Sequence, residues 1–134
     1  MTKSTFNILR VGIAITFLWI GVLIFKEPGA WGGLLQPWAA DLLPIPIKQA
    51  MIGTAILDLV IGFLLLVDVW IWPAALIGSA HLVIVLVTTG ITIVTVRDIG
   101  LLAATVALFW DRFPFAWTKG MLLPRPKPKE WREE

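Results

Sequence analysis

Residues 47–67 read IKQAMIGTAILDLVIGFLLLV, an almost unbroken apolar run with one acidic residue, Asp58, near its centre. A transmembrane helix needs about 20 predominantly apolar residues, because each adds about 1.5 Å and the hydrocarbon layer is about 30 Å thick. This run therefore predicts a membrane-spanning helix. An ionisable group inside such a helix costs roughly 2.5–3.5 kcal/mol, so Asp58 requires a partner or a polar cavity.

The composition of the whole chain agrees with a membrane protein. Of its 134 residues, 58% are hydrophobic and 15% are charged, and the mean hydropathy is +0.87. Soluble domains are about 45–50% apolar and about 25% charged, which argues against both a water-soluble globule and a disordered chain. The chain has no Cys and one His. These counts exclude a disulfide framework, a bis-His haem and a catalytic zinc site within this chain, so we expect no metal site.

Two further segments have the length and apolar character of membrane helices. Residues 8–25 are interrupted only by Arg10, and residues 70–90 carry His81. Together with the segment that contains Asp58, they predict three crossings.

The fourth crossing is harder to place. Residues 99–110 are fully apolar but reach only about 18 Å as a helix. The helix extends either backward through residues 91–96 or forward through residues 113–117. We favour a start near Asp98, with Arg97 and Asp98 at the cap and the Asp98 carboxylate accepting hydrogen bonds from unpaired backbone N–H groups.

The connection between the first two crossings, residues 26–46, has its own helical pattern. Its apolar residues recur at helical spacing: Leu34, Leu35, Trp38, Leu42 and Leu43. Pro37 suits an early helical turn, and Pro44 and Pro46 end the pattern. The sequence thus predicts an all-α fold: an integral membrane four-helix bundle with a short amphipathic interfacial helix between the first two membrane helices, which caps the bundle.

Basic residues predict the orientation, because cytoplasmic loops are enriched in Lys and Arg. With four crossings both termini share one side. That side carries eight of the basic residues: Lys3, Arg10, Arg112, Lys119, Arg125, Lys127, Lys129 and Arg132. The other side carries Lys26, Lys48 and Arg97. We expect a transmembrane domain over residues 1–118 and a basic, Pro-rich cytoplasmic tail over residues 119–134 that lies near anionic lipid and binds no nucleic acid.

The ionisable residues of the predicted spans can be compared by their depth in the membrane. Asp58 and His81 each lie about 15 Å from a membrane surface, so both fall near the midplane and can meet. Arg10 lies closer to the cytoplasmic end and would have to stretch to join them. Simpler interpretations are a snorkelling Arg10, a neutral His81 bonded to a backbone or hydroxyl oxygen, and an Asp58 that only joins two helices. The functional interpretation is a proton-accepting or quinone-headgroup site made by Asp58, His81 and Arg10.

A weak repeat links the first two crossings. Residues 12–23 align with residues 53–64 at an offset of 41, which would make the two helices antiparallel copies.

Several short motifs resemble a known family: Arg10-x-Gly12 with Phe17–Gly21 and Lys26, Pro37-Trp38, Gly53 with Asp58–Leu66, and Arg97–Leu102. On these motifs, residues 8–110 resemble the DoxX-like family of small four-helix bacterial membrane proteins. Members often have Glu where this chain has Asp58. The family is related to the DoxD subunit of thiosulfate:quinone oxidoreductase. The resemblance implies redox-associated biology in the bacterial cytoplasmic (inner) membrane.

Three functions fit the sequence. The first is a noncatalytic accessory subunit of a redox-linked or other membrane complex, with a membrane-protein partner or a second copy of the chain beside it. The second is a quinone-linked oxidoreductase component with an intramembrane Asp/His site. The third is a small proton-coupled carrier. The chain alone holds no cofactor, and quinone is the candidate ligand. A cavity between Asp58 and His81 would favour ligand binding over a purely structural role.

Overall fold

The computed structural model describes residues 1–114, which form six helices and no strand. The four long helices are α1 (Lys3–Lys26), α4 (Ile47–Leu66), α5 (Ile71–Thr89) and α6 (Val96–Arg112). The two short helices are α2 (Pro28–Gly32) and α3 (Pro37–Asp41). The all-α prediction is confirmed for these residues. The predicted tail, residues 119–134, lies outside them.

Three of the long helices, α1, α4 and α5, are long and apolar enough to cross a membrane. Large apolar side chains such as Ile8, Trp19 and Ile84 are well exposed on their outer faces. A bilayer would cover them. The helix α6 has 17 residues, or about 25 Å, which is shorter than the hydrocarbon layer.

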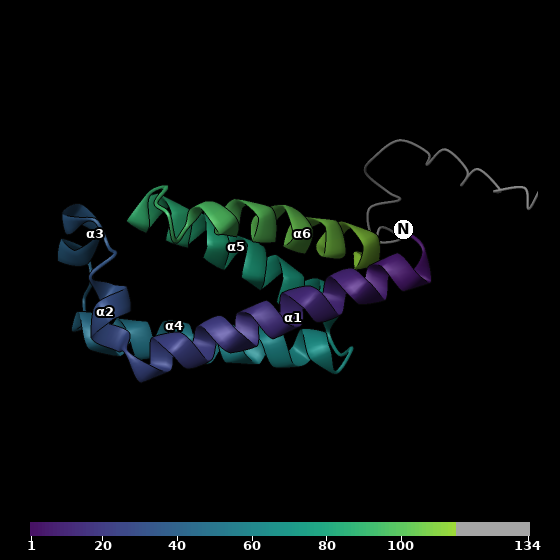
Figure 1. Ribbon diagram of the computed structural model, residues 1–134, viewed down its shortest axis with the longest axis horizontal. Helices are drawn as coiled ribbons and strands as arrows, with labels where there is room; N and C mark the ends of the chain where they lie inside the picture. The colour runs from purple at the N-terminus through teal and green to yellow at the C-terminus, as the bar shows by residue number, and fades with distance from the viewer. Residues whose placement is uncertain (115–134) are drawn as a thin grey trace, which may run out of the picture.

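The long helices form two antiparallel pairs, α1 with α4 and α5 with α6 (Figure 1). The pairs lie close together near the N-terminus and diverge toward the opposite end, where α2 and α3 lie. We call this opposite end the α2–α3 end. At the N-terminal end, the Met1 ammonium group is 3.5 Å from the Asp111 carboxylate. The Arg112 guanidinium group lies 4.0 Å from the centre of the Phe6 ring. The start of α1 and the end of α6 therefore share one end of the molecule.

Two glycines allow α1 and α4 to approach closely. A Cβ atom at Gly21 would lie 3.0 Å from the carbonyl oxygen of Ala55, and one at Gly62 would lie 2.9 Å from that of Ala14. The same offset of 41 residues relates Gly21 to Gly62 and Ala14 to Ala55. The two contacts are thus reciprocal, and the repeat offset of the sequence reappears in the packing.

The connection after α1 differs from its prediction. Two five-residue helices replace the single interfacial helix. The first ends at Gly32, and Pro37 begins the second, because proline has no N–H to continue a preceding helix but suits a first turn.

The start of α6 also differs. Thr95 is the N-cap residue and the helix begins at Val96, so Asp98 lies in the first turn and is not the N-cap. The hydroxyl groups of Thr92 and Thr95 form hydrogen bonds within the turn before α6.

Candidate functional site

Asp58 of α4 and His81 of α5 lie side by side inside the helix assembly. His81 Nε2 is 3.2 Å from Asp58 Oδ1, and the two side chains are 11% and 4% exposed. This carboxylate oxygen is buried and accepts no hydrogen bond of good geometry. The structure thus brings together the two residues that the sequence analysis placed at the same depth in the membrane.

The pair lies in the wall of a cavity of about 220 Å³. All four long helices and the α2–α3 segment contribute to this wall, which is mostly apolar, with residues such as Phe17, Trp31 and Leu35. The remaining polar wall residues are Thr54, Thr88, Thr89, Thr95 and Asp98. The cavity therefore has an apolar body and a few polar groups, as small-molecule sites do.

Asp98 is the site residue whose role the sequence analysis missed. It is buried, lines the cavity and interacts electrostatically with both Asp58 and His81. Its spacing carried a signal: Asp98, Thr105 and Leu108 recur at helical intervals and share the buried face of α6. The sequence pattern favoured Asp98 as the cap of the last helix, so it did not predict that Asp98 lines the cavity.

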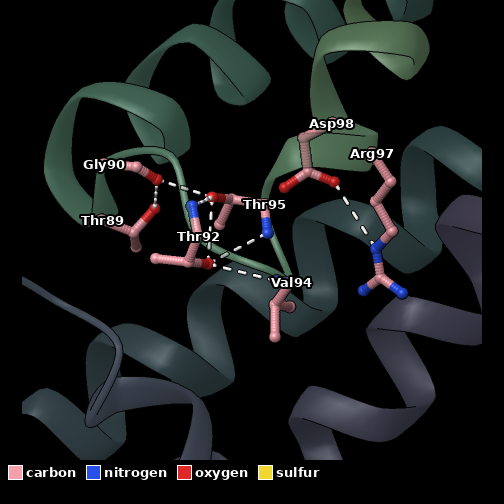
Figure 2. Close-up of polar contacts among 7 residues, drawn as sticks. All are labelled: Thr89, Gly90, Thr92, Val94, Thr95, Arg97 and Asp98. Atoms are coloured by element: carbon pink, nitrogen blue, oxygen red, sulfur yellow. Dashed lines mark hydrogen bonds and ion pairs between the residues drawn. The ribbon is translucent and has the colours of Figure 1, made fainter.

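A network of hydrogen bonds joins the residues of the α5–α6 turn that precedes Asp98 (Figure 2). The Thr95 hydroxyl donates to the carbonyl oxygen of Gly90 at 2.6 Å and accepts from the Thr92 N–H at 2.8 Å. The Thr92 hydroxyl accepts from the Thr95 N–H at 3.1 Å. Arg97 Nε lies 3.8 Å from Asp98 Oδ1. The turn thus holds Asp98 between the cavity and an arginine.

The segment that contains α2 and α3 forms part of the cavity wall at the α2–α3 end. The Gln36 N–H donates to the carbonyl oxygen of Thr88 at 2.9 Å, which attaches the segment to the end of α5. Trp38 Nε1 donates to Gln36 Oε1 at 2.7 Å. These bonds hold a wall of the cavity in place.

Arg10 does not join the pair. Its Nη1 donates to the carbonyl oxygen of Leu65 and, at 2.9 Å, to that of Leu66, and its Nε is 3.6 Å from Asp68 Oδ1. The last carbonyls of a helix have no partner within the helix, and a cation there also suits the helix dipole. Arg10 is buried, but it binds the carbonyl oxygens at the end of α4 and does not line the cavity.

The side chains of the site can exchange protons and form hydrogen bonds. Within residues 1–114, no group of three His, Asp or Glu residues is arranged to hold a metal ion. An adjacent carboxylate and imidazole can hold, give or take one proton, and a neighbouring hydroxyl or carbonyl group can bond to them.

Comparison with known protein families, with curated proteins and with solved structures found no match.

Proposed function

We propose that this chain is a DoxX-like membrane protein that binds the ring of a quinone and serves a redox-linked complex of the bacterial cytoplasmic membrane. The observation that carries the proposal is the Asp58–His81 pair, with 3.2 Å between the two groups, in the wall of a largely apolar cavity.

We further propose that the chain crosses the membrane four times and that α6 is the fourth crossing. Tilt and local thinning of the bilayer accommodate a helix of about 25 Å at modest cost. The N-terminal end is cytoplasmic, because the sequence assigns eight of the eleven basic residues to that side and three to the other. The α2–α3 end, with α2 and α3 at the interface, faces the outside.

The cavity suits a ring-sized group. Its volume of about 220 Å³ is below the roughly 300–1,000 Å³ of sites for drug-sized ligands. The His81 ring can donate a hydrogen bond to a carbonyl oxygen, and the Asp58 carboxylate can accept one from a hydroxyl group. These are the polar groups of the oxidised and reduced forms of a quinone, respectively.

A bound quinone supplies two-electron redox chemistry, and the residues of this chain hold the ring and exchange its protons. The chain has no Cys and one His. Electrons would therefore pass to or from a partner protein, which makes this chain an accessory subunit of the redox complex.

The test is equilibrium binding of short-chain ubiquinone and menaquinone analogues to the purified chain in lipid nanodiscs. A hydrogen bond to a charged group contributes about 1.5–3 kcal/mol, so D58N and H81Q should weaken binding about 10- to 100-fold. The matched control is D41N, which makes the same change at an exposed residue of α3 outside the cavity wall. The proposal would be contradicted if the wild-type chain showed no saturable binding. It would also be contradicted if D58N and H81Q bound the analogues as tightly as the wild-type chain.

A further inference from the structure

We infer that the Asp58–His81 pair exchanges protons with water at the α2–α3 end only, and that Asp98 is the group through which the protons pass. The inference rests on the proposed function, because a side of exchange has meaning only where the helices cross a bilayer. It concerns the route of the proton and does not depend on which ligand occupies the cavity.

Asp98 lies in the first turn of α6, at the α2–α3 end of the molecule. It lines the same cavity and interacts electrostatically with both members of the pair. Its neighbour Arg97, 3.8 Å away, has a side chain that is 49% exposed. The cavity of about 220 Å³ has room for several water molecules, since each occupies about 30 Å³ in the liquid. Water can therefore connect Asp98 to the pair.

Few other charged groups face Asp98. Arg97 of its own helix, Asp58 of α4 and His81 of α5 are the groups that act on it. Among the described residues of the cavity wall, α1 and the α2–α3 segment contribute no titratable side chain. Asp98 is thus the one carboxylate of this wall outside the pair.

The route toward the N-terminal end is closed by packed apolar side chains. Leu65, Ala75 and Leu108 are completely buried there. The buried hydroxyl groups on this side are already bonded: Ser79 donates to the carbonyl oxygen of Ala75 at 2.8 Å and lies 3.0 Å from the Thr105 hydroxyl. Thr105 in turn donates to a backbone carbonyl oxygen of its own helix at 2.9 Å. Packed apolar side chains and hydroxyl groups that are already bonded give a proton no continuous path across this layer.

The transfer is balanced. The Asp98 carboxylate takes one proton from water at the α2–α3 end. It passes this proton through water in the cavity to the Asp58–His81 pair, and Asp98 is then a carboxylate again. One proton has then moved from the outer water to the pair, and the reverse sequence releases it on the same side.

The side of exchange can be measured on His81, the single histidine of the chain. The chain is labelled with ¹⁵N-histidine and reconstituted in one orientation into vesicles whose inner and outer pH are set separately. Because the chain has no Cys, D41C labelled with an impermeant maleimide reports the orientation. We expect the ¹⁵N signal of the His81 ring to follow the pH on the α2–α3 side and to ignore the other side. A signal that follows the N-terminal side, or both sides, would overturn the inference.

The role of Asp98 is tested by the rate at which the His81 ring N–H exchanges with water. D98N should slow this exchange at least tenfold, D98E should restore it, and D41N should leave it unchanged. Wild-type exchange in D98N would remove Asp98 from the route. The gradient measurement leaves the cavity residues unchanged, so it decides the side of access even where D98N fails to fold. Neither measurement uses a quinone, so a failure to bind quinone leaves this inference standing.

Discussion

A methyl group added at Gly62 is expected to weaken the packing of α1 against α4. A Cβ atom there would lie 2.9 Å from the carbonyl oxygen of Ala14 and 2.9 Å from the backbone nitrogen of Leu18, whereas ordinary contacts begin at 3.4 Å. Backbone atoms cannot rotate away, so α1 must shift, and overpacking of this kind costs about 1–3 kcal/mol. Alanine is also the better helix former by about 1 kcal/mol, which hides part of this cost.

Gly53 on the same helix separates the two effects, because a Cβ atom there meets nothing within 4 Å. G53A therefore has the gain in helix propensity without the clash. The free energy of unfolding of G62A should lie about 1–3 kcal/mol below that of G53A, measured by reversible unfolding in mixed micelles. On α1, G21A should fall below its control G12A in the same way. A difference within about 0.5 kcal/mol, the range of ordinary surface substitutions, would refute the close approach of α1 and α4.

Three further variants test the ends of the molecule. Arg10→Met removes the hydrogen bonds to the last carbonyls of α4 and should cost about 1–3 kcal/mol in the same unfolding assay, with Arg10→Lys losing less; wild-type stability in Arg10→Met would contradict this role. Gly90 has φ +73°, and a Cβ atom there would lie 2.7 Å from Gln36 Nε2, so G90A should cost about 1–2 kcal/mol and speed hydrogen exchange at the Gln36 N–H; unchanged exchange would show that the α2–α3 segment is not held at this point. T95V should destabilise the α5–α6 turn by about 1–2 kcal/mol, whereas T16V, which loses a hydroxyl bonded only within its own helix, should not; equal effects would count against the turn.

Hydropathy and helical periodicity were sufficient for the main helices. The segment 47–67 became α4 (Ile47–Leu66), because a long apolar run has one stable arrangement in a membrane. Counting the rise per residue also related Asp58 to His81, since two helices of known direction bring residues of equal depth to the same level. This part of the site follows from one-dimensional information.

The rest depended on contacts that no local pattern shows. The partners of Arg10 are backbone carbonyls at the end of α4, and carbonyls have no signature in a sequence. Asp98 resembled a cap because it precedes an apolar run, but α6 begins earlier, at Val96, and Asp98 lies on its buried face. The resemblance to the DoxX-like family and the binding of a quinone stay predictions.

The account depends most directly on the contact between Asp58 and His81 within a lipid bilayer. Solid-state NMR of the chain labelled with ¹⁵N-histidine and with ¹³C at the aspartate carboxyl carbon measures this contact, because a single histidine gives an unambiguous signal. We predict a strong dipolar coupling between the His81 ring nitrogen and one aspartate carboxyl carbon, consistent with 3.2 Å between Nε2 and Oδ1, that is lost in D58N and kept in D98N. An uncoupled His81 ring in the wild-type chain, or a coupling that survives in D58N, would contradict it.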